Sequence, residues 1–245
     1  MDTNQEFLAV LDTFIEFLIV AIHQILYERS IYLPRTFTAV EIYRLPVQQS
    51  RHPGLCAYIN HAATVIRDAI LSGMIKRISV VIFVQDLPCE QFVFDISRLS
   101  QKRLDTAGKQ SELEETFSVV DAEEQLRAVL SKLIYYCISL EALDEHRTFN
   151  TVIEPDDASA LDPDVRRQWV DIPNIYTEDD LQSREQVSND VKIWSVKAGA
   201  LAFEVWYKSA RTKTPPSSHT PSQLQASEGP IMSSPSDIYG TFPSF

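Results

Sequence analysis

Apolar side chains recur every three or four residues between positions 6 and 32, which is the spacing of one face of an α-helix. The stripe consists of Phe7, Val10, Leu11, Phe14, Leu18, Ile22, Ile25 and Leu26, and it is widened by Ile15, Ile19 and Ala21. A helix over residues 6–29 is about 35 Å long, enough to cross a small domain. We therefore expect one dominant helix on which the other elements pack.

This first helix is not predicted to span a membrane. Its longest run without a charged or polar side chain, residues 17–22, is far shorter than the roughly 20 apolar residues that a span requires. Asp12, Glu16 and His23 interrupt the wider segment, and no basic start or small-residue cleavage site precedes it. The pattern favours a core helix, with His23 as a hydrogen-bonded core or boundary residue.

Two later segments are also predicted to be helices. The first begins at Pro53, which suits the first helical position, with His52 as a candidate cap and Gly73 as its end. The second follows Asp121, which a glutamate follows three residues later in a capping arrangement. Their apolar faces consist of Leu55, Ile59, Ala62, Ala63, Ile66 and Ile70 in the first helix, and of Leu126, Val129, Leu130, Leu133, Ile134, Cys137, Leu140 and Leu143 in the second.

Short apolar runs predict a central hairpin and a third strand. Residues 75–84 are almost continuously apolar, so both faces of that strand should be covered. Residues 85–90 are predicted to form its hairpin connection, and residues 91–96 its return strand. Residues 149–153 should join the same sheet.

Two further segments complete the predicted fold. Residues 191–207 indicate a late hairpin with its turn at Gly199, and its apolar face comprises Leu201, Phe203, Val205 and Tyr207. Residues 37–47 indicate a short irregular strand or hairpin with a break at Pro46. The predicted fold class is α+β, with three helices packed on a mostly antiparallel sheet.

The composition changes twice in the last third of the chain. Between residues 154 and 190, eleven carboxylates face three arginines, a local balance of −8. Residues 211–245 hold six of the thirteen prolines and eight serines, without periodic apolar positions. Such a segment buries too little surface to offset its ordering entropy, so we expect a domain over residues 1–210 and a disordered Ser/Pro-rich tail over 211–245.

The overall charge argues against a protein that grips nucleic acid by itself. The chain has 22 Lys and Arg against 34 Asp and Glu, a net charge of −12. Phosphate contacts require a surplus of basic side chains. The three cysteines, Cys56, Cys89 and Cys137, form no CxxC pattern, so we expect neither a disulfide framework nor a zinc site. With no secretory signal, an intracellular location is the default.

Candidate catalytic and metal-binding groups are few. The six glycines form no phosphate-binding loop, and no nucleophile-elbow or HExxH motif is present. His52 and Cys56 lie one helical turn apart, so a Cys–His nucleophile pair competes with a structural cysteine and a half-exposed histidine. Trp169 and Trp206 suit either a core or a partner-binding surface. The residues favour a non-enzymatic interaction module without catalytic residues, cofactor or metal.

Two stretches carry a resemblance to a known family. Residues 16–32 (EFLIVAIHQILYERSIY) resemble the first-helix signature of HORMA-domain proteins, and residues 46–59 (PVQQSRHPGLCAYI) are similar to the segment entering their second helix. Residues 78–96 and 124–127 resemble the members that serve as the accessory subunit of the translesion DNA polymerase zeta. The resemblance covers residues 6–208.

The resemblance implies a fold and a function. In the family, a C-terminal "safety belt", here about residues 154–208, wraps around a short proline-containing peptide. A polymerase zeta accessory subunit traps such a peptide of the catalytic subunit and docks the C-terminal domain of the scaffold deoxycytidyl transferase. The expected protein is thus a non-catalytic nuclear adaptor in translesion DNA synthesis and the DNA damage response. The alternative is a spindle-checkpoint or meiotic HORMA protein that binds closure-motif peptides.

The same resemblance assigns the expected peptide-binding residues. Tyr58 matches the second-helix tyrosine that contacts the trapped peptide. Residues 171–176 resemble the belt motif that stacks on it, although Asn174 stands where the family has tryptophan. Ile175 belongs to this motif, and Tyr176 or Trp169 is the candidate to replace the missing tryptophan.

Three further residues correspond to positions that bind other proteins. Arg127 matches the third-helix arginine used in HORMA–HORMA dimerisation. Glu204 and Trp206 stand where the scaffold-binding glutamine and tyrosine lie, so only the aromatic character of this pair is kept.

Overall fold

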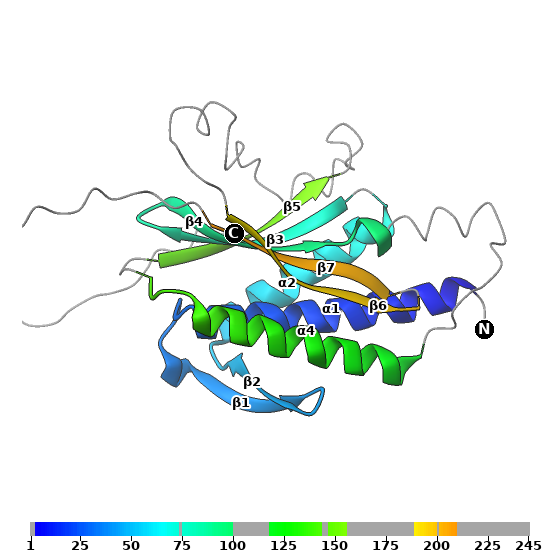
Figure 1. Ribbon diagram of the computed structural model, residues 1–245, viewed down its shortest axis with the longest axis horizontal. Helices are drawn as coiled ribbons and strands as arrows, with labels where there is room; N and C mark the ends of the chain where they lie inside the picture. Colours follow the sequence, from blue (N-terminus) through cyan, green and yellow to red (C-terminus); the bar gives the residue numbers. More distant parts are fainter. Residues whose placement is uncertain are drawn as a thin grey trace, which may run out of the picture. The chain divides into compact units, whose positions relative to one another are not determined.

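An antiparallel sheet of five strands forms the centre of the fold, in the order β5-β3-β4-β7-β6 (Figure 1). Its strands are β3 (Ile75–Val84), β4 (Leu87–Asp95), β5 (Arg147–Pro155), β6 (Asn189–Ala198) and β7 (Leu201–Ser209). The computed structural model describes residues 3–73, 75–99, 118–143, 147–155, 189–199 and 201–209. All of them belong to one unit, Met1–Thr212.

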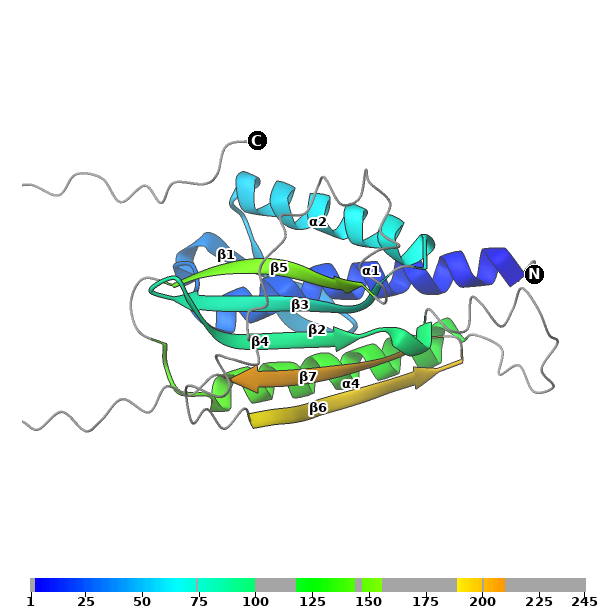
Figure 2. The same ribbon diagram turned by 90° about the horizontal axis from the view of Figure 1, so that it is seen from above.

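Three long helices, α1 (Thr3–Glu28), α2 (Pro53–Leu71) and α4 (Val119–Ser139), lie on one face of this sheet (Figure 1). α1 contacts both of the others, with α2 toward β5 and α4 toward β6 and β7 (Figure 2). A 3-10 turn, η1 (Pro34–Thr36), leads into a separate hairpin of β1 (Phe37–Ile42) and β2 (Leu45–Ser50), which packs on α1 through β2. The predicted α+β class is confirmed.

α1 is the core helix that its apolar stripe predicts. Phe7–Glu28 has the length and composition of a membrane-crossing helix, but most of it is buried inside the protein. The rings of Phe14 and Phe17 contact Phe203 of β7, with centroids 5.1 and 5.3 Å away. Phe17 also meets Phe94 of β4 at 6.3 Å. These contacts join the N-terminal helix to strands near both the middle and the end of the chain.

The ends of α2 are formed as the sequence predicts. His52 is the N-cap, and its Nδ1 accepts a hydrogen bond from the Leu55 N–H at 3.2 Å. Pro53 occupies the first turn, where a missing N–H removes no helical bond. Gly73 has a φ of 73°, the left-handed conformation that ends helices and that glycine adopts without a steric penalty. The predicted buried face of α2 is buried in the structure.

The N-terminus of α4 differs from the prediction. The helix begins before Asp121, and Ser118 is its N-cap, with Oγ accepting from the Asp121 N–H at 3.3 Å. Asp121 instead lies in the first turn, where a carboxylate interacts favourably with the helix dipole. Serine and aspartate both cap well, and the spacing of Asp121 and Glu124 gives no indication that Ser118, three residues earlier, is the cap.

Both early hairpins turn more tightly or earlier in the chain than the sequence predicts. The β3–β4 turn is Gln85-Asp86, with φ of 52° and 63°, so 87–90 belong to a strand and not to the connection. The β1–β2 turn is at Tyr43 and Arg44, with φ of 51° and 58°. Pro46 does not break the second strand but pairs with Glu41. Positive φ at non-glycine residues is uncommon, which is why composition alone made the β3–β4 connection too long and missed the turn at Tyr43 and Arg44.

β3 is covered on both of its faces, as its continuous apolar run predicts. Val80 and Ile82 point toward the helices and belong to the main core cluster. Ser79 and Val81 point to the opposite face and are also buried. The middle of β3 is therefore buried on both faces.

The late hairpin is part of the same core. β7 pairs with β4, and β6 pairs with β7, so the hairpin lies at the edge of the sheet far from β5. The predicted alternation is confirmed, since all four apolar residues of β7 belong to the core cluster: Leu201, Phe203, Val205 and Tyr207. Gly199, with a φ of 57°, lies in the turn.

A buried ion pair joins this hairpin to two helices. Arg29, just after α1, donates from Nε and Nη2 to the two carboxylate oxygens of Glu90 on β4, each at 2.8 Å. Its remaining N–H groups donate to the carbonyls of Cys137 and Glu141, at the end of α4. The hydroxyl of Tyr207 on β7 donates to Glu90 at 3.2 Å. Four elements therefore meet at one charged pair that is almost fully buried.

His23 should make stability depend on pH. It is buried, its Nδ1 accepts from the Ser50 N–H at 3.4 Å, and burial lowers its pKa from 6.5 to about 4. Because the folded state disfavours protonated His23 more than the unfolded state does, the free energy of unfolding is unaffected by this group above pH 6.5. It falls as the pH drops from 6.5 toward 4, where the unfolded state takes up the proton first. Urea unfolding at pH 7.5, 5.5 and 4.5 should show His23→Asn, which keeps an acceptor but cannot titrate, losing less stability than wild type. Equal losses in both proteins would contradict this role.

Candidate functional site

The outer edge of β5 is open among the described residues. β5 pairs with β3 along its whole length, from Arg147 opposite Val84 to Pro155 opposite Ile75. The described strands include none on its other side. A strand with one free edge presents backbone N–H and C=O groups that can pair with another extended chain.

Tyr58 of α2 lies against this edge. Its ring packs edge-on against Phe149 of β5, with centroids 5.6 Å apart, and Phe149 in turn meets Tyr32 at 6.3 Å. The Tyr58 hydroxyl accepts a hydrogen bond from the Thr151 backbone N–H at 3.4 Å. The tyrosine is 38% exposed. It therefore combines a supported ring with a surface that a ligand can reach.

Thr151 is poorly satisfied at two polar groups. Its N–H donates to the Tyr58 hydroxyl at a long distance of 3.4 Å, and among the described residues its buried Oγ1 has no hydrogen-bond partner. A buried polar atom without a partner costs about 1–3 kcal/mol relative to a satisfied one. The middle of β5 is thus a place where added hydrogen bonds would be favourable.

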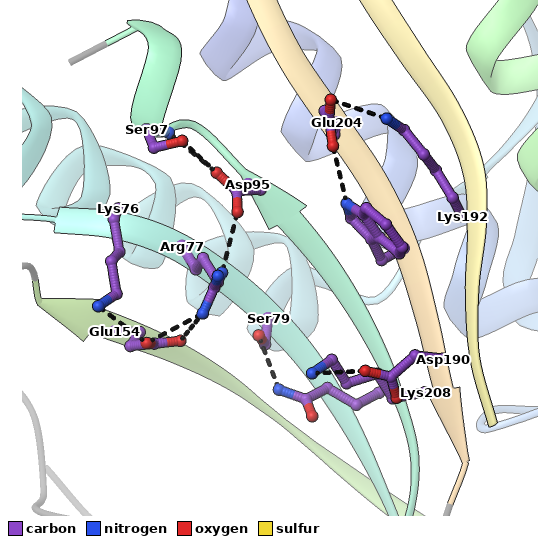
Figure 3. Close-up of polar contacts among 12 residues, drawn as sticks. Lys76, Arg77, Ser79, Asp95, Ser97, Glu154, Asp190, Lys192, Glu204 and Lys208 are labelled. Carbon is purple, nitrogen blue, oxygen red and sulfur yellow. Dashed lines mark hydrogen bonds and ion pairs between the residues drawn. The ribbon is translucent and has the colours of Figure 1, made fainter. Parts of the chain in front are cut away.

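Glu204 and Trp206 form a second candidate surface. Glu204 lies on the sheet face opposite the helices (Figure 3), and Trp206, two residues later on β7, shares that face. The Glu204 carboxylate accepts from Lys192 Nζ at 2.8 Å and from the Trp206 indole N–H at 3.2 Å. Arg98 lies 3.7 Å from the same carboxylate. The Lys192 ammonium also lies over the Trp206 ring, 5.2 Å from its centroid. The two predicted residues therefore act as one unit with Lys192.

Further charges surround this unit on the same face (Figure 3). Arg77 of β3 bridges Asp95 at 2.9 Å and Glu154 at 3.2 Å. Although desolvation by burial alone raises the pKa of Asp95, hydrogen bonds from Ser97 and Arg77 outweigh it and hold that pKa below its ordinary value. Asp95 is therefore a stable negative charge beside Glu204, which lies opposite it in the strand pairing.

Arg127 is on the outer side of α4, apart from both other candidate surfaces. Its side chain is 44% exposed and lies 3.9 Å from Glu124, one turn earlier. Two large exposed side chains follow it at helical spacing, Tyr135 and Ile138. α4 thus presents a separate surface with one cation and two apolar groups.

The remaining predicted peptide-binding residues, Trp169, Asn174, Ile175 and Tyr176, lie outside the described residues. Sequence reasoning missed Thr151 and Lys192. The alternation of residues 149–153 indicates which side chains share a face, but not that β5 is an edge strand. Lys192 reaches Trp206 because the β6–β7 register shifts between Lys192 and Trp194, which a count from the turn does not reveal.

The Cys–His nucleophile alternative does not form. His52 Nδ1 is engaged as the helix cap, and the Cys56 thiol donates to the Ser50 carbonyl at 3.1 Å. Both groups serve the start of α2. Within the described part of the chain, no His, Cys, Asp and Glu side chains cluster in a way that could hold a metal ion.

Comparison with known proteins gives a consistent result. Residues 11–157 match the family model described as HORMA domain. The chain is 29% identical over 171 residues to the zebrafish (Danio rerio) "Mitotic spindle assembly checkpoint protein MAD2B", covering 69% of this chain and 77% of that protein. It is 27% identical over 207 residues to the Schizosaccharomyces pombe "DNA polymerase zeta processivity subunit", covering 84% and 95%.

Solved structures share the fold at low sequence identity. A chain of the mitotic checkpoint complex aligns with a TM-score of 0.61 at 17% identity, covering 82% of this chain and 99% of that one. Caenorhabditis elegans HTP-2 bound to the HIM-3 closure motif aligns with a TM-score of 0.56 at 19% identity, covering 80% and 87%.

Proposed function

Since the chain belongs to the HORMA-domain family, we propose that it is the non-catalytic adaptor subunit of DNA polymerase zeta in translesion DNA synthesis. The adaptor traps a proline-containing peptide of the catalytic subunit and joins it to the scaffold deoxycytidyl transferase. Its relationship to a polymerase zeta processivity subunit over most of both chains supports this choice. The HORMA protein HTP-2, which shares the fold, is described as bound to a closure motif.

The observation that carries the proposal is the placement of the two ends of the acidic segment. The chain leaves β5 at one edge of the sheet after Pro155 and enters β6 at the opposite edge at Asn189. A five-stranded sheet is roughly 20 Å wide, at about 4.8 Å between neighbouring strands. Residues 156–188 can span several times that distance, since an extended chain covers about 3.3 Å per residue. A connection of this length is long enough to pass around a peptide held at β5.

The peptide would bind as an added strand on the open edge of β5. Backbone hydrogen bonds along the strand supply affinity, and pockets for alternate side chains supply specificity. Tyr58 lies where such a pocket is needed, with its ring supported by Phe149. The belt residues Trp169, Asn174, Ile175 and Tyr176 are proposed to complete the pocket.

The scaffold would bind elsewhere on the sheet. Glu204 and Trp206 belong to β7, which β3 and β4 separate from β5. The two partners can therefore bind at once, as an adaptor requires. Arg127 on α4 is left for HORMA–HORMA dimerisation. A role in translesion synthesis places the protein in the nucleus.

Co-expression tests the proposal most directly. The chain, co-expressed with the catalytic chain of DNA polymerase zeta from the same organism, should co-purify with it as a stable complex. A set of overlapping peptides along that catalytic chain should then identify a proline-containing segment that binds. Deleting the chain after Ile153 would be a poor test, because it removes β6 and β7 and with them part of the core. Absence of both the complex and any binding peptide would contradict the proposal.

Tyr58→Ala should weaken binding of that peptide by about 1–3 kcal/mol, or roughly 5- to 150-fold in Kd, as is usual for a packed aromatic residue at an interface. Most of the change should appear as faster dissociation. Surface plasmon resonance would measure both rates. Tyr135→Ala is the matched control, because Tyr135 is a tyrosine on α4 that is 75% exposed. Equal losses in the two variants would remove Tyr58 from the site.

A checkpoint or meiotic signalling protein is the second candidate. The zebrafish relative, described as a mitotic spindle assembly checkpoint protein, favours this candidate. Purification of the tagged chain from its native cells separates the two, because the proteins recovered with it should be polymerase subunits in one case and kinetochore or chromosome-axis proteins in the other.

A further inference from the structure

We propose that the Tyr58 hydroxyl is a removable cap on the edge of β5, and that Thr151 behind it fixes the register of the bound peptide. The inference rests on the proposed function for the identity of the ligand. The cap itself is a property of the free protein. One residue thereby has two separate roles, with its ring supporting the ligand and its hydroxyl competing with it.

The strand pairing shows which backbone groups of β5 face outward. In an antiparallel sheet, residues alternate between those that bond to the neighbouring strand and those whose N–H and C=O point away from it. Thr151 is paired with Val80, yet its N–H bonds to Tyr58 of α2. Thr151 is therefore an outward-facing position, and so are Phe149 and Ile153, two residues to either side.

The geometry of the cap makes it replaceable. Backbone N–H···O bonds in strands are about 2.9–3.0 Å long, whereas the Tyr58 oxygen is 3.4 Å from the Thr151 nitrogen. A peptide carbonyl at ordinary distance would be the better acceptor. Until it arrives, the hydroxyl keeps one outward N–H from being wholly unpaired, which lessens the tendency of an open edge to pair with unintended chains.

The ring does not depend on the hydroxyl for its position. Tyr58 packs edge-on against Phe149, which also contacts Tyr32. An incoming strand can therefore displace the oxygen from Thr151 while the ring stays beside the edge. Phenylalanine at position 58 should keep this packing and lose only the cap.

The same pairing restricts the sequence of the ligand. In an antiparallel pairing with β5, the ligand residue opposite Thr151 accepts from the Thr151 N–H and donates its own N–H to the Thr151 carbonyl. Proline has no N–H, so it is excluded at that position and at positions two residues away that pair with Phe149 or Ile153. Prolines fit at the intervening positions, whose N–H groups point away from β5. Each proline of the peptide must therefore lie an odd number of residues from the ligand residue opposite Thr151.

Amide hydrogen exchange of the free protein tests the cap without any ligand. In Tyr58→Phe the Thr151 amide should exchange about 2- to 10-fold faster than in wild type, the factor that a typical hydrogen bond is worth. Amides in the middle of β3, such as that of Val81, should not change, and Tyr135→Phe should leave Thr151 unaltered. An unchanged Thr151 rate in Tyr58→Phe would overturn the cap.

Peptide kinetics then test the competition. The probe is the tightest-binding 15-residue member of the overlapping peptides along the polymerase zeta catalytic chain. Tyr58→Phe should bind it at least as tightly as wild type and associate faster, whereas Tyr58→Ala should release it faster. If Tyr58→Phe loses as much affinity as Tyr58→Ala, the hydroxyl holds the ligand and is not a competing cap.

N-methylation of the same peptide, one position at a time, tests the register. Affinity losses of tenfold or more should recur at every second residue, and each proline should lie an odd number of residues from every sensitive position. Losses without this alternation would overturn the register. If no peptide in the set binds wild type, the proposed function fails while the exchange experiment still decides whether the cap exists.

Discussion

Arg29→Met should lower the free energy of unfolding by about 3–5 kcal/mol, because it leaves the buried Glu90 carboxylate without its counter-charge. Arg29 contributes two 2.8 Å bonds to Glu90, and the two side chains are only 3% and 6% exposed. The substitution also leaves the carbonyls of Cys137 and Glu141 without their donors. Methionine fills much of the volume of the arginine stem, so lost packing is the smaller part of the effect. Urea unfolding followed by circular dichroism would measure it.

Two control variants separate charge from packing. The double variant Arg29→Met/Glu90→Leu removes both charges and should recover much of the stability, since an apolar pair can replace a buried ion pair. Arg67→Met breaks the ion pair with Asp12, in which the side chains are 32% and 54% exposed, and should cost no more than about 1 kcal/mol. If Arg29→Met lowered the free energy of unfolding by no more than Arg67→Met does, the argument from buried charge would be refuted.

Phe203→Ala should cost about 3–5 kcal/mol, the usual range for removing a fully buried phenylalanine ring. Phe203 is 1% exposed and packs against Phe14 and Phe17 of α1. Because it belongs to β7, the loss would show that the late hairpin stabilises the domain and is not an appendage. Thermal or urea unfolding gives the value, and Val191→Ala is a control on the same hairpin at a residue that is 38% exposed. A small effect at Phe203, similar to that at Val191, would mean that the hairpin is mostly detached in solution.

The helices could be predicted from sequence because each carries a long periodic face. The stripe from Phe7 to Leu26 and the cap at His52 are set by residues close together in the sequence, and the structure confirms both. Gln85 and Asp86 lie within the predicted connection 85–90, but its length was overestimated, since neither residue marks a tight turn as strongly as glycine does. The alternation in β7 indicated its buried face but left open which sheet edge it joins. That choice depends on distant contacts such as Tyr207 with Glu90.

The candidate site was less accessible to sequence reasoning than the fold. Periodicity does not single out Tyr58 on α2, and only the family resemblance assigned it a role. Thr151 matters for its backbone N–H, which every residue except proline possesses, so no side-chain pattern could have indicated it. Lys192 needed the register shift in β6 before it could be placed beside Trp206.

The opposite positions of β5 and β6 have a consequence for the rate of capture. While β7 is paired with β4, the backbone from β5 through residues 156–188 to β6 closes a ring with the sheet. On the proposed function, a short peptide can thread through that ring by its free end. The same segment in the middle of a long polypeptide, flanked by folded domains, has no end to thread. Capture of the intact partner must then wait for the hairpin to leave β4, at the cost of the Tyr207–Glu90 bond, and its rate should become independent of partner concentration.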